Sequence, residues 1–131
     1  MTKEEKKNIA SVLKMQKTLI DNIYNACAEN AKIFEVNYVP VAYVKMMGGI
    51  ATESISNSIK NDSKKIPDGP EKDTMTKVLE LNDTMIDSIN KACKLKAEEF
   101  HVDYVPIKLL RGICDLAWEN IETGLKKGFG N

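Results

Sequence analysis

The chain has 131 residues, which is enough for one domain with a substantial apolar core. Its 19 Lys and Arg residues balance 19 Asp and Glu residues, so the formal net charge is zero. We therefore expect no nucleic-acid partner, because a chain without excess positive charge has no field that attracts a phosphate backbone.

No apolar run approaches the length of a membrane span, and the N-terminal MTKEEKKN is charged with no apolar segment behind it. We therefore expect neither a membrane span nor a signal peptide, and a cytoplasmic location by default. The three cysteines form an odd set in a chain long enough to fold without disulfides. Reduced thiols are the expectation.

An internal repeat of 66 residues is the strongest pattern in the chain. TLIDNIYNACAENAKIFEVNYVP aligns without a gap with TMIDSINKACKLKAEEFHVDYVP, and 18 of 52 positions are identical when residues 9–60 are compared with 75–126. We interpret this as a tandem duplication within a single domain over residues 1–131, with one repeat at 1–66 and the other at 67–131.

The first half of each repeat predicts a long amphipathic helix, because apolar residues return at alternating steps of three and four. A second apolar seam lies beside the first, so each long helix needs two apolar neighbours. The capping pattern Thr2 to Glu5, and Asp68 to Glu71 in the second repeat, predicts where these helices begin. The main seam consists of Ile9, Leu13, Gln16, Ile20, Ile23, Cys27 and Phe34, matched by Met75, Leu79, Asn82, Ile86, Ile89, Cys93 and Phe100.

The segment V-[ND]-Y-V-P predicts a short connection to a second, shorter helix in each repeat. Two such hairpins predict an all-α, antiparallel four-helix bundle. An open pair of hairpins that swaps or forms a homodimer is the structural alternative, because it would bury the same seams.

One layer of this bundle could carry chemistry. With the first turn centred near residue 37, Cys27 lies opposite Gly48, and by the repeat Cys93 faces Cys114, with Met47 next to the layer. Thiolates and a thioether suit a soft metal or a thiolate-ligated cofactor, so these three cysteines are candidate ligands. The plainer interpretation is that they are small buried apolar residues, and the lack of a CxxC spacing favours it.

Gln16 and Asn82 occupy equivalent positions in an otherwise apolar seam. With Gly48 and Met47 they are candidate residues for a ligand cavity in the core. The alternative, which we favour, is that the two amides bond each other or water and set the helix register. For Gly48, close helix approach is favoured over a ligand-sized void.

A surface on the first repeat is a candidate interface. Tyr24, Ile33 and Tyr43 correspond to Asn90, Glu99 and Leu109, so most of these sites are more polar in the second repeat. The recurrent Tyr38 and Tyr104 are expected to pack their rings over the bundle end. His101, the only histidine, is expected in an exposed loop.

No catalytic constellation is evident, and a cysteine nucleophile would lack a nearby base. We therefore expect a non-enzymatic binding or interaction module that takes a protein partner or a small hydrophobic ligand. The alternative is a soft-metal or cofactor carrier that uses Cys27, Cys93 and Cys114.

Overall fold

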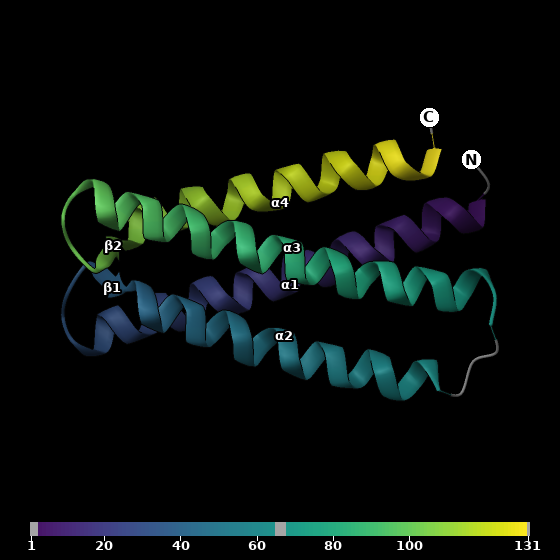
Figure 1. The fold of residues 1–131 in the computed structure, drawn as a ribbon, viewed down its shortest axis with the longest axis horizontal. Helices are drawn as coiled ribbons and strands as arrows, with labels where there is room; N and C mark the ends of the chain where they lie inside the picture. Colours follow the sequence, from purple (N-terminus) through teal and green to yellow (C-terminus); the bar gives the residue numbers. More distant parts are fainter. Residues whose placement is uncertain (1–2, 65–67, 131) are drawn as a thin grey trace.

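The two apolar seams of each long helix are covered by two neighbouring helices. A computed structural model describes residues 3–64 and 68–130, in which α1 packs against α2 and α4, and α3 packs against the same two helices. The result is the predicted all-α antiparallel four-helix bundle, closed within one chain (Figure 1). Its elements are α1 (Lys3–Ile33), β1 (Tyr38–Pro40), α2 (Val41–Ser63), α3 (Pro70–Glu99), β2 (Tyr104–Pro106) and α4 (Ile107–Gly130).

Both long helices end in the same way. After α1, Val36 N–H donates to the carbonyl of Ala31 at 2.9 Å and Glu35 N–H donates to that of Lys32 at 3.1 Å. Glu35 has a φ of 54°, the left-handed conformation that closes such a helix end. His101, with a φ of 57°, repeats this arrangement after α3. The exposed loop histidine is therefore part of a helix-terminating turn.

The start of α3 differs from the prediction. The helix begins at Pro70, its N-cap is Gly69, and no side chain caps it. Pro suits this position because its fixed φ matches the helix and its missing N–H needs no partner there. Asp68 lies too early to cap and instead pairs with Lys72, with Oδ1 and Nζ 3.3 Å apart. The corresponding prediction for the first repeat involves Thr2, which lies outside the described residues.

A two-stranded antiparallel sheet joins the two repeats, where the sequence predicted only a connection. Val39 and Val105 face each other at its centre, and both are buried. Sequence patterns do not reveal strands this short, since three residues that end in proline give no useful alternation. The ring centres of Tyr38 and Tyr104, the first residues of the two strands, lie 4.4 Å apart, so the two rings pack against each other.

The second helix of each repeat also begins with a backbone hydrogen bond to the other repeat. The N–H of Val41, at the start of α2, donates to the Asp103 carbonyl at 2.9 Å. The N–H of Ile107, at the start of α4, donates to the Asn37 carbonyl at 2.8 Å. These N–H groups have no partner within their own helices, so the two repeats satisfy each other.

Phe34 and Phe100 do not close the apolar seams as predicted. They are 68% and 64% exposed, because α1 and α3 end one residue earlier and the chain then turns through the left-handed residue. The seam positions nearest to them that are buried are Ala31 and Ala97.

Glu35→Gly should raise the free energy of unfolding by about 1 kcal/mol, because a left-handed conformation costs a residue with a Cβ about 1–2 kcal/mol and glycine almost nothing. Urea unfolding measures this difference. The control is Glu29→Gly inside α1, which should lower the same quantity by about 1 kcal/mol. A loss of stability in Glu35→Gly would contradict the role given to this turn.

Candidate functional site

The predicted cysteine layer exists. Cys27 of α1, Cys93 of α3 and Cys114 of α4 are all buried and form no disulfide. Burial raises the pKa of Cys27 and Cys114 to about 12 and that of Cys93 to about 11, from an ordinary 9.0. The charge that Cys93 would carry raises the pKa of the other two further, so the thiols lie within electrostatic reach of one another.

The three thiols are not arranged as a metal site. Without a metal, burial keeps all three thiols protonated up to an unusually high pH. Among the residues that the structure describes, no group of three or more Cys, His, Asp or Glu side chains is arranged to hold a metal ion. The cluster therefore has the properties of a buried apolar layer.

Gly48 does not open a ligand cavity. A Cβ at this position would lie 3.2 Å from Cγ2 of Ile86 on α3, so the space in front of the glycine is already filled. Close approach of α2 to α3 is the reason for glycine here. Gly49 differs, because a Cβ there would meet nothing within 4 Å.

Gln16 and Asn82 are fully buried, as their seam positions predicted. They do not bond each other: Nε2 and Oε1 of Gln16 and Nδ2 and Oδ1 of Asn82 have no hydrogen-bond partner within the described part of the chain. Neither residue lines the two surface pockets described below.

The three residues of the predicted interaction surface do not form one patch, because Tyr24 and Ile33 lie on α1 and Tyr43 lies on α2. Tyr24 is half-buried, and Cζ of Arg111 on α4 lies 4.8 Å from the centre of its ring. That guanidinium also pairs with Asp115 at 2.6 Å and with Asp21 at 3.6 Å, so Tyr24 belongs to the contact between α1 and α4. Ile33 is 71% exposed and Tyr43 is half-buried.

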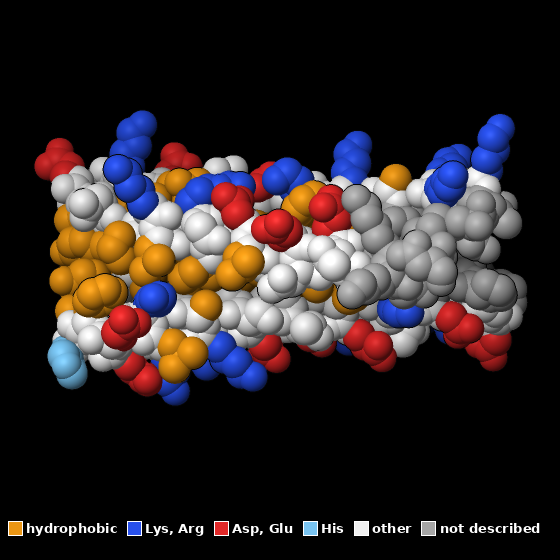
Figure 2. All heavy atoms as spheres, turned by 90° about the horizontal axis from the view of Figure 1, so that it is seen from above, with side chains coloured by type: hydrophobic (Ala, Val, Ile, Leu, Met, Phe, Trp, Pro, Cys, Tyr) orange, Lys and Arg blue, Asp and Glu red, His pale blue; other side chains and the backbone are white. Residues whose placement is uncertain are grey.

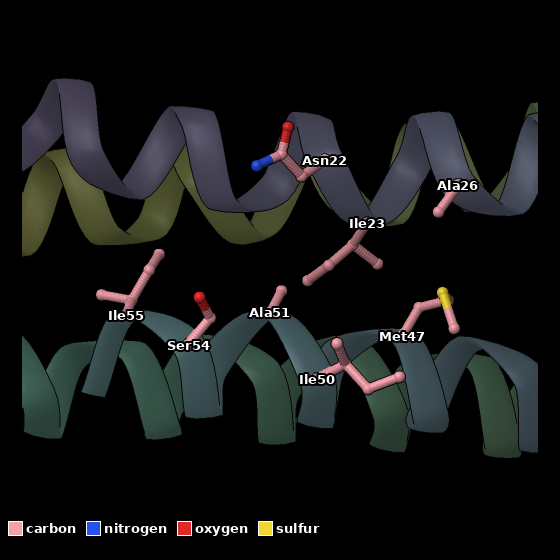
Figure 3. Close-up of a pocket in the computed structure, with 8 residues that line it drawn as sticks. All are labelled: Asn22, Ile23, Ala26, Met47, Ile50, Ala51, Ser54 and Ile55. Carbon is pink, nitrogen blue, oxygen red and sulfur yellow. The ribbon is translucent and has the colours of Figure 1, made fainter. Parts of the chain in front are cut away.

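A pocket of about 300 Å³ lies between α1 and α2 and is open to solvent along one side (Figure 3). Small side chains, Ala26, Ala51 and Ser54, leave the space, and larger apolar side chains form its walls. Met47 is the residue predicted for a cavity that does line this pocket. The lining residues are Asn22, Ile23, Ala26, Met47, Ile50, Ala51, Ser54 and Ile55.

The predicted surface residues Tyr43 and Ile33 extend the two walls of this pocket. Tyr43, Met47, Ile50 and Ser54 follow one another at helical steps of four and three, so they share one face of α2. Ile33 lies seven residues after Ala26, on the corresponding face of α1. We call the surface from Ile33 and Tyr43 to Ser54 and Ile55 the α1–α2 groove.

Sequence reasoning missed Ile50, the most exposed large side chain of the pocket wall, at 57%. An apolar residue on one side of a buried seam looks like part of that seam, and the spacing alone does not tell which positions a neighbouring helix covers. The same holds for Leu116, its equivalent in α4, which is 59% exposed.

A second pocket, of about 440 Å³, lies between α2 and α3. Three of its lining residues, Glu53, Asp83 and Asp87, are exposed carboxylates. It is therefore shallow and acidic, and it offers less apolar wall than the α1–α2 groove.

Hydrophobic side chains also gather at the end of the bundle that carries the sheet, at the left of the face shown in Figure 2. Over the middle of that face, among the residues drawn in colour, charged side chains alternate with a few hydrophobic ones (Figure 2). Phe34, Phe100 and Ile33 are the large exposed apolar residues that belong to the helix ends here.

Comparison with known proteins gave no match to a family model, to a curated protein or to a solved structure. Within the described ranges, none of the helices is long and apolar enough to cross a membrane.

Gly49→Ala should raise the free energy of unfolding by about 1 kcal/mol, because alanine is the better helix former and the added methyl group meets nothing. Gly48→Ala should raise the free energy of unfolding clearly less, since the added methyl group presses on the buried Ile86. Thermal or urea unfolding of the two variants tests this, and an equal gain would show that α2 and α3 do not approach closely at Gly48.

Stability should fall as the pH rises above about 9. The unfolded thiols lose their protons near the ordinary pKa of 9.0, whereas the folded ones retain them until about 11 or 12. The stability that the three protonated thiols contribute is therefore complete below pH 9. Above pH 9, each thiol lowers the free energy of unfolding by up to about 1.4 kcal/mol per pH unit. Urea midpoints at about pH 8 and 10 measure the loss.

Cys27→Ala is the control for this measurement, because the other groups that titrate at high pH remain in it. It should lose less stability than the parent chain between the two pH values. Equal losses would show that Cys27 is not held protonated by burial.

Proposed function

We propose that this chain is a non-enzymatic interaction module that binds an apolar side chain of a protein partner in the α1–α2 groove. The observation that carries the proposal is the pocket at its centre, whose walls are mostly apolar and whose large residue Ile50 stays 57% exposed. Apolar surface that is contiguous, concave and open to solvent is typical of binding sites.

The size and shape of the pocket favour a protein partner over an enclosed small molecule. At about 300 Å³ it lies at the lower limit of ligand pockets, and it is open along one side. A side chain presented on another protein needs less enclosure, because its own chain covers the open side. Figure 3 shows Ile23 of α1 and Ala51, Ser54 and Ile55 of α2 directed toward the space between the two helices, whereas Asn22 and Ile50 lie over their own helices.

The polar groups at the pocket support binding without chemistry. Asn22 and Ser54 supply an amide and a hydroxyl at the pocket, which can orient a partner by hydrogen bonds. Among the described residues that line it, there is no Asp, Glu, His, Cys or Lys. A general acid, base or nucleophile would have to come from the partner.

Toluene, the side-chain analogue of phenylalanine, is a direct probe of the groove. In the protein labelled with ¹³C at its methionine methyl groups, toluene should shift the Met47 signal in a saturable manner. The signal of Met46, which is exposed and does not line the pocket, should stay in place. Nuclear magnetic resonance titration measures both.

Two matched variants decide whether the groove is responsible. Ile50→Ser should weaken toluene binding about fivefold, equivalent to about 1 kcal/mol of lost apolar contact. Leu116→Ser changes a residue of similar exposure at the equivalent position of the other repeat and should leave the titration unchanged. Absence of a saturable shift at Met47, or equal weakening by both variants, would refute the proposal.

A further inference from the structure

Three helices contribute buried polar groups that no protein atom satisfies. Gln16 of α1 and Asn82 of α3 have fully buried amides, and the buried ring nitrogen Nε1 of Trp118 on α4 is in the same condition within the described residues. Together they present five nitrogen and oxygen atoms without a partner. Leaving a buried polar group unpaired costs about 1–3 kcal/mol, so five such groups in one small domain need an explanation.

These groups lie in one part of the core. Gln16 and Asn82 are 66 residues apart, at equivalent positions of two hairpins that the sheet joins symmetrically, so they lie at the same height of the bundle. Nζ of Lys17, the residue after Gln16, lies 5.1 Å from the centre of the Trp118 ring. The indole therefore packs beside the turn of α1 that carries Gln16.

The buried positions next to the two amides on their own helices offer no other partner. Along α1 the buried residues nearest to Gln16 are Val12 and Leu19, and along α3 those nearest to Asn82 are Val78 and Met85. None of these side chains donates or accepts a strong hydrogen bond. A rotation of one amide therefore does not bring it to another polar side chain of its own helix.

We propose that Gln16, Asn82 and Trp118 form an internal site for water, in which bound molecules bridge the two amides across the core. Water fits the chemistry of the site, because each amide offers both donors and an acceptor while the indole only donates. A buried water molecule typically makes about three hydrogen bonds to such groups. The site is independent of the α1–α2 groove, since none of its three residues lines that pocket.

The bridge would also explain how the two repeats stay in register. Slippage of one hairpin by a helical turn would move one amide away from the other and break the bridge. A shared polar layer is a known means of setting register in helical bundles, at some cost in stability. Here the layer acts through water, since the amides do not reach each other.

Water–protein cross-relaxation in nuclear magnetic resonance tests the proposal on the unaltered chain. The chain has one tryptophan, so its indole proton is identified without ambiguity. This proton and the side-chain amide protons of Gln16 and Asn82 should show cross-peaks to water with the sign of long-lived bound molecules. The exposed amides of Asn25 and Asn57 are the internal control and should show only short-lived surface water.

Near-isosteric variants add a second measurement. Gln16→Met and Asn82→Leu should each raise the equilibrium constant of unfolding about tenfold. The reason is that the remaining amide loses the partner to which water bridges it. The double variant should be at least as stable as the parent chain and should lose the water cross-peak at Trp118. As a control, Asn25→Leu and Asn57→Leu remove exposed amides. Their effects on the free energy of unfolding should add in the double variant, which means that the two positions are not coupled.

The outcomes separate the alternatives. Water cross-peaks together with coupled stability effects support the site. Coupling without water cross-peaks would mean that the amides bond each other directly in solution, which overturns it. Additive effects would mean that the amides do not share a bridge, which overturns it as well.

Discussion

The exchange of backbone hydrogen bonds between the two repeats, at the end of the bundle that carries the sheet, is the constraint on which the rest of the structure depends. Asn37 and Asp103 accept the first N–H of the helix that begins in the other repeat, and Val39 pairs with Val105 between them. Neither hairpin can complete these bonds alone, so α2 and α4 start at matched heights. This symmetric junction explains why the cysteines form a layer and why Gln16 and Asn82 lie at the same height of the bundle.

The symmetry fails where side chains of the two repeats differ, and there the differences have local physical reasons. Gly48 stands where the second repeat has Cys114, and Ile86 fills the space in front of the glycine. Equivalent sequence positions therefore do not have equivalent surroundings, since a bundle pairs α1 with α4 and α2 with α3 through different side chains. The polar groups in the core show the same effect: Trp118 of α4 has Thr52 as its counterpart, and Thr52 donates to the Gly48 carbonyl at 2.7 Å instead.

The buried thiols and the surface pocket offer different properties: the thiols are enclosed, whereas the pocket is open to solvent. A reactive cysteine needs a stabilised thiolate, whereas burial holds Cys27, Cys93 and Cys114 in the neutral form. The α1–α2 groove instead keeps a large apolar side chain, Ile50, in contact with solvent, which costs free energy unless something covers it. This contrast is why the groove, and not the cysteine layer, carries the proposed function.

The sequence alone determined the four helices, their order and most of the core, because apolar spacing at steps of three and four reports directly which face of a helix is buried. It also identified the burial of Gln16, Asn82 and the cysteines, which follows from their places in the seam. Only the tertiary structure decided what each buried group meets: Ile86 against Gly48, Arg111 over Tyr24, and no protein partner for the two amides. The strands and the α1–α2 groove also came from the structure alone. Both depend on the distance and rotation between helices, and the residue types of a single helix do not specify these.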